Sequence, residues 1–281
     1  MMARRVVIAG ASNQLGHRLA PKLCERGWHP LGLARSRAPT DWPGEWFSFD
    51  LSRPDAIHWP EPPAAWVHAA PISLLPAAAF SCQQVIVFSS TSAETKARSA
   101  SATERELART LAAGEQRAMS MAESAGCQCH IIRPTLIWGC GRDRNITALW
   151  RWLQRYRLLP VAINRSGLRQ PVHVDDLALA VLQLLDTPHS SRVWTLPGAE
   201  ALAYSDMLRR IQRCVAGPSR IQALPEVIWR ALLLCLPTAK RQSVHAMLQR
   251  MGQNLDFPSK DWEALGIEPR GFQPSRRDFN E

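Results

Sequence analysis

The chain has 281 residues, enough for one large α/β domain with a smaller appended lobe and for a core that needs no disulfide bonds. Lysine and arginine outnumber aspartate and glutamate by 34 to 24, a formal net charge of +10, and almost all of the cations are arginines. This charge suits phosphate-bearing small molecules, nucleic acid or an anionic membrane surface. Because no helix-turn-helix, zinc-finger or aromatic-rich RNA-binding signature accompanies it, nucleic acid is the weakest of these partners.

The cysteines and the N-terminus indicate a reducing compartment. The seven cysteines are scattered and mostly embedded in apolar segments, which predicts reduced core thiols. No charged region followed by an apolar signal opens the chain, because Ile8 and Ala9 run directly into a glycine turn, so we expect a cytoplasmic protein. Cys127, Cys129 and His130 fit a strand better than a metal site, and we expect no metal.

Through residue 133, short apolar runs alternate with helical patterns, as is typical of a parallel sheet with crossover helices. The expected strands are Val6–Ala9, Pro30–Ala34, Trp46–Phe49, Ala65–Ala69, Val85–Phe88 and Gln128–Arg133. The clearest helices between them are Gln14–Arg26 and Ser101–Ser124. The sequence therefore predicts a Rossmann-type, doubly wound parallel α/β sheet with helices on both faces.

After residue 134 helical patterns dominate. The expected helices are Thr147–Arg157, Asp175–Leu185, Tyr204–Val215, Glu226–Leu236 and Arg241–Gly252. We expect a dinucleotide-binding domain at residues 1–140 and a smaller, mainly helical substrate lobe at 141–281, with a segment near 171–197 returning to the sheet. The apolar stretch Val227–Leu236 is too short to span a bilayer; burial in the lobe is favoured over a position on a surface.

The first strand runs into Gly10-Ala-Ser-Asn-Gln-Leu-Gly16, a turn typical of nucleotide-binding βα units. Gly10 would leave the strand in a tight turn, and Gly16 would let the helix pack closely on the sheet. The helix N-terminus would then offer free N–H groups and a positive dipole end to a pyrophosphate. Asn13 stands where a third small residue is expected. Because Asn readily adopts a positive φ, a working pocket with altered geometry is favoured over a decayed one.

The end of the second strand predicts which dinucleotide is bound. A carboxylate there would hold a ribose hydroxyl, whereas an arginine would accommodate a 2′-phosphate. The chain has Ala34-Arg35-Ser36-Arg37 and no carboxylate at this point. We therefore expect NADP(H) in preference to NAD(H); the alternative is a solvated turn with two surface arginines.

Further segments fall at strand ends of the predicted sheet: Phe49-Asp50-Leu51, His68-Ala69-Ala70, Val87-Phe88-Ser89-Ser90-Thr91, Ile132-Arg133-Pro134-Thr135 and Pro171–Ala178. With the glycine turn, they resemble the extended and atypical short-chain dehydrogenase/reductases, the superfamily that includes nucleotide-sugar epimerases and dehydratases. The resemblance covers most of the chain. The cofactor-binding residues that it implies are Gly10, Ser12, Asn13, Gln14, Leu15, Gly16, Arg35, Arg37, Asp50, Leu51, Ala69, Ala70, Ser89 and Pro134.

The resemblance also implies a Tyr-x-x-x-Lys pair on the helix after the fifth strand, where the tyrosine acts as acid and base in hydride transfer. Aligning Gly114-Glu115-Gln116 with the residues after that lysine places Leu107 and Leu111 at the two positions. Neither side chain moves a proton. The remaining polar candidates are Thr91, which matches the family's active-site hydroxyl, Ser89 and Ser90 beside it, and Lys96 in the following loop. Of these, Thr91 and Lys96 are the expected catalytic residues. A capped strand end with a solvated lysine explains these two equally well.

By the same resemblance, the arginines after residue 140 face the substrate cleft, where forked guanidinium groups would bind a diphosphate or a carboxylate. The expected substrate-binding residues are Arg142, Arg144, Arg169 and His173. Asp175 and Asp176 follow His173 directly. We interpret these two carboxylates as caps of the next helix rather than as partners of a catalytic base.

Three functions are compatible with these features. The first, favoured by the breadth of the resemblance, is an NADP-dependent reductase or epimerase-like enzyme acting on a phosphorylated or acidic small molecule. The second, nearly as well supported, is a non-catalytic NADP(H)-binding regulatory or assembly protein that docks on a protein partner or a membrane. It would be similar to redox-sensing regulators or to the accessory short-chain-dehydrogenase-like subunit of respiratory complex I. The third, a nucleic-acid binder, is the least supported.

Overall fold

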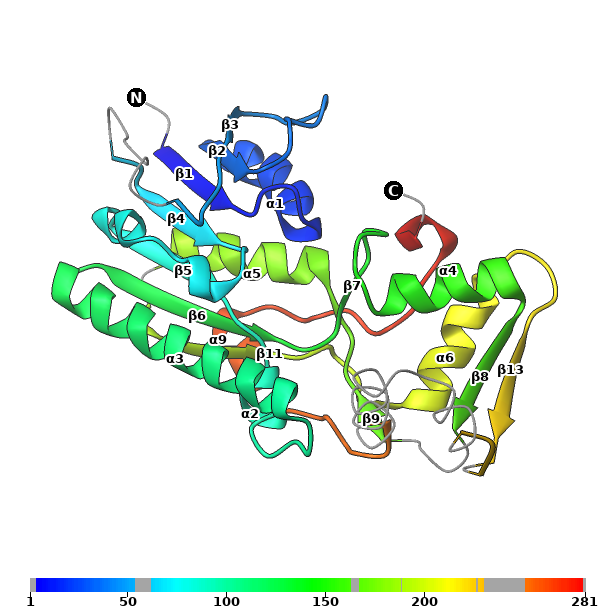
Figure 1. The fold of residues 1–281 in the computed structure, drawn as a ribbon. Helices are drawn as coiled ribbons and strands as arrows, with labels where there is room; N and C mark the ends of the chain where they lie inside the picture. The colour runs from blue at the N-terminus through cyan, green and yellow to red at the C-terminus, as the bar shows by residue number, and fades with distance from the viewer. Residues whose placement is uncertain are drawn as a thin grey trace.

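The computed structural model describes residues 4–53, 62–162, 167–187, 189–225, 227–229 and 251–279. Its larger part is built on a seven-stranded sheet in the order β11-β6-β5-β4-β1-β2-β3 (Figure 1). Every strand pair in this sheet is parallel. The predicted doubly wound α/β fold is confirmed.

Each expected strand is present, with ends that shift by at most two residues. The strands of the sheet are β1 (Arg4–Ala9), β2 (Trp28–Ala34), β3 (Glu45–Ser48), β4 (Ala65–His68), β5 (Gln84–Phe88), β6 (Gln128–Pro134) and β11 (Arg192–Leu196). Only β11 had not been predicted as a strand. All residues of β4 and β5 are buried, because a parallel sheet covered on both faces needs continuous apolar runs.

Two apolar cores lie on opposite faces of the sheet. On one face, Val6 and Ile8 of β1 pack with α1 (Gln14–Glu25) and α5 (Val174–Asp186). On the other face, Val7 and Ala9 pack with α3 (Ala102–Ala125) and with the 3₁₀ turns η2 (Ile72–Leu74) and η3 (Ala77–Ser81). The short α2 (Ser92–Thr95) follows β5. Strand order reverses on either side of β1, so a ligand crevice is expected at the carboxyl ends of β1 and β4.

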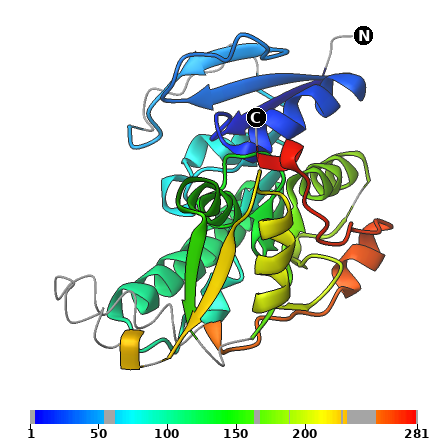
Figure 2. The same ribbon diagram turned by 90° about the vertical axis from the view of Figure 1, so that its right-hand side faces the viewer.

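A third core holds the remaining elements together. It packs α4 (Ile146–Tyr156) and α6 (Tyr204–Arg213) beside the parallel pair β8 (Leu158–Ala162) and β13 (Arg220–Leu224). Figure 2 shows these two strands side by side next to α6. Two short two-stranded sheets complete the fold. They pair β7 (Ile137–Trp138) with β10 (Val172–His173), and β9 (Leu168–Arg169) with β12 (Leu202–Ala203).

The C-terminal segment contacts both parts of the molecule. Trp262 and Leu265 of α9 (Lys260–Leu265) belong to the core beneath α5 and β11. Farther on, the 3₁₀ turn η4 (Arg276–Phe279) lies against α4, where the rings of Phe279 and Trp150 stack with centroids 5.1 Å apart.

The predicted helices near α4, α5 and α6 are confirmed within two residues at each end. Most of Glu226–Leu236 and Arg241–Gly252 lies outside the described residues. Within the described part, Val227 is 77% and Ile228 is 44% exposed, so the expected burial of this stretch is wrong at its start. A division of the chain at residue 140 stays a prediction. In the part of the chain that the structure describes, no helix combines the length and apolar character needed to cross a membrane.

Two buried histidines make the stability of this fold depend on pH. Burial lowers the pKa of His68 and of His130 to about 4, and His189 and Arg192 contribute to the effect at His130. The unfolded chain binds protons near pH 6.5, whereas the folded chain binds them only near pH 4. The contribution of these two histidines to the free energy of unfolding is therefore fully present above about pH 6.5 and is lost as the pH falls toward 4.

We expect the free energy of unfolding in urea to fall by about 2 kcal/mol per histidine between pH 7 and pH 5. The variant His130→Asn should lose roughly half of that pH dependence, whatever its absolute stability at pH 7. Equal slopes for the wild type and for the double variant with His68→Asn would contradict the assignment.

Candidate functional site at the dinucleotide crevice

The turn after β1 needs both of its glycines. Gly10 has a φ of +85°, and a Cβ on it would lie 2.8 Å from the backbone nitrogen of Ala70. A Cβ on Gly16 would lie 2.2 Å from the carbonyl oxygen of Ala11, because α1 begins directly over the turn. These close approaches place the N-terminus of α1 against the carboxyl ends of β1 and β4.

Asn13 does not have the positive φ that the sequence suggested. Its φ is −84° and its ψ 175°, an extended conformation, and it is the N-cap residue of α1. The side-chain Oδ1 accepts hydrogen bonds from the backbone N–H groups of Leu15, at 2.9 Å, and of Gly16, at 3.1 Å. The side-chain Nδ2 donates to the carbonyl oxygen of Ala69, at 2.8 Å. We call these three hydrogen bonds the Asn13 bridge.

The Asn13 bridge spans the point where a dinucleotide would cross the sheet. It joins the first turn of α1 to Ala69, the residue directly after β4, and so crosses the expected crevice. It also occupies the N–H groups of Leu15 and Gly16, two of the donors expected to face a pyrophosphate. A diphosphate that used these donors would first have to displace the Asn13 side chain.

The two arginines predicted to bind a 2′-phosphate lie in the turn directly after β2. Arg35 and Arg37 are both exposed, and the turn that carries them accepts hydrogen bonds from Trp46 Nε1 and from Ser48 Oγ. Asp50 lies close by, in the turn after β3. The backbone N–H of Ser52 is the main cause of a lowered pKa at Asp50, and Arg35 contributes electrostatically. Leu51 beside it is buried in the second core.

At the end of β5, the side-chain hydroxyl groups of Ser89 and Thr91 donate hydrogen bonds to other groups of the protein. Thr91 is 8% exposed; its Oγ1 and its backbone N–H both donate to the carbonyl oxygen of Pro134, at 3.3 and 3.2 Å. Ser89 Oγ donates to Glu115 on α3. Lys96 is half-buried at the C-terminal end of α2. The predicted catalytic hydroxyl is therefore held by a backbone carbonyl.

An ion cluster around the buried Glu115, which the sequence did not reveal, lies next to these hydroxyls. Arg133 at the end of β6 donates from Nε to Glu115 Oε1 at 2.9 Å and from Nη2 to Glu115 Oε2. It also pairs with Glu94 of α2. The hydrogen bonds with Glu115 are the main cause of a raised pKa at Arg133. One feature of the sequence pointed to this cluster: Glu115 lies on the apolar side of the predicted helix, one helical turn after Leu111.

The two positions aligned with the family's Tyr and Lys carry no polar group. Leu107 is 42% exposed on α3, and Leu111 packs against the second core. The only tyrosines of the chain are Tyr156 in α4 and Tyr204 at the start of α6. No phenol therefore lies on α3.

His173 caps α5 in place of the two aspartates. Its Nδ1 accepts a hydrogen bond from the N–H of Asp175 at 3.1 Å, and its ring packs edge-on against Trp138. Asp175 and Asp176 lie in the first turn of α5, as expected, but neither of them is its N-cap residue. The carboxylate of Asp176 instead binds the backbone N–H and the Nε of Arg270, at 3.0 and 2.7 Å.

The structure does not gather the predicted substrate residues at one place. Arg169 is 8% exposed and donates to the carbonyl oxygens of Leu168 and Gln253; burial lowers its pKa. Arg142 and Arg144 line a shallow cavity of about 520 Å³ whose lining comes entirely from residues 142–156. His173 is 4% exposed and its ring packs against Trp138.

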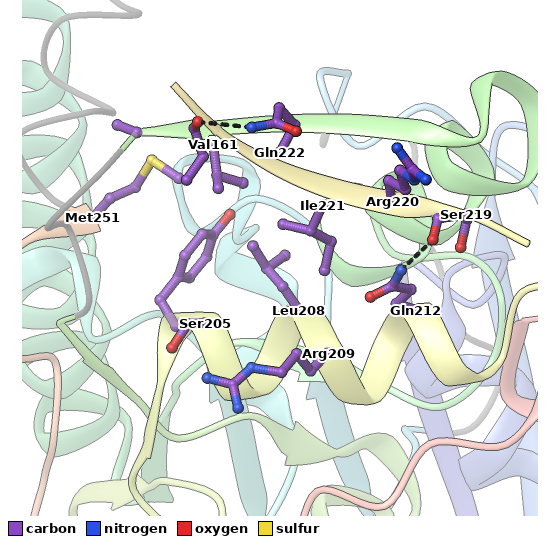
Figure 3. Close-up of a pocket in the computed structure, with 13 residues that line it drawn as sticks. Val161, Ser205, Leu208, Arg209, Gln212, Ser219, Arg220, Ile221, Gln222 and Met251 are labelled. Atoms are coloured by element: carbon purple, nitrogen blue, oxygen red, sulfur yellow. Dashed lines mark hydrogen bonds between the residues drawn. The ribbon is translucent and has the colours of Figure 1, made fainter. Parts of the chain in front are cut away.

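A second, larger cavity of about 640 Å³ lies between α6 and the β8–β13 pair (Figure 3). Leu208, Ile221 and Val161 form its apolar wall, while Gln212 at one end donates to the carbonyl oxygen of Ser219. None of its lining residues comes from the seven-stranded sheet. The described residues contain no group of three or more side chains that could hold a metal ion.

Comparison with solved structures finds the same fold in nucleotide-sugar epimerases. UDP-N-acetylglucosamine 4-epimerase from Bacillus cereus is 16% identical, with a TM-score of 0.71 over 98% of this chain and 97% of that one. UDP-glucose 4-epimerase from Thermus thermophilus, in complex with NAD, is also 16% identical, with a TM-score of 0.65 over the same shares of the two chains. UDP-glucuronic acid 4-epimerase from Bacillus cereus, in complex with NAD, is 14% identical, with a TM-score of 0.64 over 89% of this chain and 99% of that one. The resemblance to the extended short-chain dehydrogenase/reductases is thus confirmed at the level of the fold.

Sequence comparisons reach only part of the chain. No protein-family profile matches it. Subunit 9 of the mitochondrial NADH dehydrogenase (ubiquinone) 1 alpha subcomplex from Dictyostelium discoideum is 31% identical over 84 residues, which are 30% of this chain and 23% of that protein. An uncharacterized protein of Sinorhizobium fredii is 25% identical over 161 residues, 56% of this chain and 40% of that protein. The matched region spans less than half of either relative.

Loss of the Glu115 carboxylate should destabilise the fold strongly. In the variant Glu115→Ala, Arg133 would remain half-buried without its main partner, so we expect the free energy of unfolding to fall by about 3–5 kcal/mol. The matched control is Glu106→Ala on the same helix, which removes an exposed pair with Arg109 and should cost less than about 1 kcal/mol. Similar losses in urea unfolding for both variants would contradict the structural role of the cluster.

Proposed function

We propose that the protein is a non-catalytic NADP(H)-binding protein with the epimerase fold, of the regulatory or assembly kind. The observation that carries this proposal is the pair Leu107 and Leu111 on α3, at the positions where the resemblance requires an acid/base tyrosine and its lysine. Thr91, the remaining hydroxyl candidate, donates to Pro134. The fold is therefore retained, while the tyrosine and lysine that would move a proton are missing from their usual positions on α3.

The residues of the crevice fit the two halves of a dinucleotide unequally. Arg35 and Arg37 are exposed where a 2′-phosphate would lie, which favours NADP(H) over NAD(H). The backbone N–H groups that would bind the diphosphate are occupied by the Asn13 bridge. Bound NADP(H) would supply a hydride donor or acceptor. In our proposal, Arg35 and Arg37 anchor the adenosine end, and Asn13 must leave its partners before the diphosphate reaches α1.

The remaining cofactor-site residues have supporting roles in this proposal. Gly10 and Gly16 bring the turn close to the sheet, and Ala69 and Ala70 form the opposite wall of the crevice. Ser12 belongs to the turn itself, and Gln14 and Leu15 begin α1. Asp50 and Leu51 follow β3, Ser89 follows β5, and Pro134 ends β6. A cytoplasmic location is also part of the proposal. It is supported by the free thiols of the six described cysteines.

Titration with NADPH and NADH, followed by thermal unfolding, tests this proposal. A ligand that binds only the folded state raises the melting temperature, and we expect a larger rise with NADPH than with NADH. The double variant Arg35→Gln/Arg37→Gln should lose that difference, because the 2′-phosphate then has no cationic partner. The control Arg105→Gln/Arg109→Gln removes the same charge from α3 and should leave the difference intact. No stabilisation of the wild type by either dinucleotide would contradict the proposal.

The second candidate function is an NADP-dependent reductase or epimerase-like enzyme for a phosphorylated or acidic small molecule. It is favoured by the full-length likeness to nucleotide-sugar epimerases, and it assigns the chemistry to Thr91 and Lys96. This candidate predicts either net oxidation of NADPH or conversion of a UDP-sugar into its epimer, and a rate that falls in Thr91→Val and in Lys96→Ala. Our proposal predicts no turnover above the buffer background for the wild type. Turnover that both variants abolish would establish the enzyme instead.

A further inference from the structure

The outer side of α4 and the segments that flank it carry an unusual concentration of positive charge. Over residues 142–158 there are five arginines and a single acidic residue. The arginines are Arg142, Arg144, Arg151, Arg155 and Arg157, and all five are exposed. We call the exposed surface of residues 142–158 the α4 face.

The charge of the α4 face is not neutralised within the described residues. None of its five arginines forms an ion pair with a described residue. The carboxylate of Asp143 is buried and turned toward its own helix, where it accepts from the N–H groups of Asn145 and Thr147 and from the Thr147 hydroxyl. Arg151 and Arg157 donate to backbone carbonyls and keep their charge. The surface is therefore strongly electropositive.

Three large apolar side chains lie among these arginines. Trp152 is 46%, Tyr156 is 54% and Leu158 is 46% exposed. Trp152 Nε1 donates to the carbonyl oxygen of Leu158 at 2.9 Å, so the polar edge of the indole is satisfied within the protein. What remains outside is apolar ring and aliphatic surface, next to guanidinium groups. Exposed apolar groups flanked by cations are typical of helices that lie in a bilayer interface.

The aromatic rings of the α4 face are poorly placed for stacking on nucleic-acid bases. The rings of Trp152 and Tyr156 lie against each other with centroids 4.6 Å apart, tilted by 49°. The guanidinium of Arg155 lies 5.5 Å from the Tyr156 ring centroid. Single-strand binding needs open ring faces on which successive bases stack, and these contacts cover part of those faces. An anionic lipid surface needs only charge and apolar edges.

We propose that the α4 face docks on the surface of an anionic lipid bilayer. The arginines contact headgroup phosphates, and the shallow cavity of about 520 Å³ between Arg142, Arg144 and Arg155 receives one of them. Trp152, Tyr156 and Leu158 enter the interfacial layer. The opposite side of α4 stays in the protein core through Ile146 and Leu153, so docking requires no unfolding of the helix.

Vesicle flotation with the full chain tests this proposal. Vesicles of phosphatidylcholine alone are compared with vesicles that contain about 30% phosphatidylglycerol, at about 0.1 M salt. We expect binding only to the anionic vesicles, and weaker binding as salt is raised. The double variant Arg144→Gln/Arg155→Gln should bind about 25-fold more weakly, since each arginine near an anionic surface contributes about fivefold. Trp152→Ala/Tyr156→Ala should bind about tenfold more weakly because apolar burial is lost.

The matched control removes two positive charges elsewhere. Arg109→Gln/Arg209→Gln changes side chains that are 74% and 62% exposed on α3 and α6, and it should bind within about twofold of the wild type. Equal losses in the control and in the α4-face variants would overturn the proposal in favour of unspecific charge attraction. Absence of wild-type binding to anionic vesicles would also overturn it. Salt-dependent binding of a single-stranded oligonucleotide, lost in the α4-face variants, would then assign the face to nucleic acid.

Discussion

The Asn13 bridge is the interaction on which the state of the crevice depends. One side chain caps α1 through two N–H groups and holds the carbonyl oxygen of Ala69 at the end of β4. An N-cap of this kind contributes about 1 kcal/mol to helix stability. The same atoms lie where the Rossmann arrangement places a diphosphate, so helix capping and dinucleotide binding compete for one set of donors.

The part of the expected crevice at the ends of β5 and β6 is also filled by the protein's own groups. Thr91 donates to Pro134, and Ser89 joins the cluster of Glu115 and Arg133. These contacts satisfy polar groups that a cofactor or a substrate would otherwise meet. The fold found in nucleotide-sugar epimerases is kept, while internal hydrogen bonds hold the expected crevice between α1 and β4 and at the ends of β5 and β6. At the end of β2, Arg35 and Arg37 remain exposed. This arrangement supports our proposal of a binding or assembly role.

The strands and their parallel, doubly wound arrangement could be predicted, because a strand that is buried on both faces of a sheet must be a short apolar run. The same holds for α3, whose cap and spacing are local. The conformation of Asn13 could not be predicted, because the choice between a positive φ and a side-chain cap depends on Ala69, 56 residues away. The pairing of Asp176 with Arg270 is a similar case, because it depends on a C-terminal segment whose position the local pattern does not encode.

Arginine-rich stretches misled the sequence interpretation for a different reason. A guanidinium suits a ligand phosphate, a backbone carbonyl and a lipid headgroup equally well, and spacing alone does not choose among them. The structure separates these uses: Arg169 binds the backbone, Arg133 binds a buried carboxylate, and Arg142 and Arg144 face outward with an exposed aromatic pair nearby.

The most direct test of the account is the affinity for NADPH of the variant Asn13→Gly, measured by calorimetry beside the wild type. Glycine at an N-cap costs the helix only a few tenths of a kcal/mol, so the fold should persist. If Asn13 competes with the diphosphate, the freed N–H groups of Leu15 and Gly16 should tighten binding about tenfold, the equivalent of about one hydrogen bond. Asn145→Gly at the start of α4, where no side-chain cap bond exists, should change nothing. Tight binding by the wild type that Asn13→Gly weakens would contradict the account.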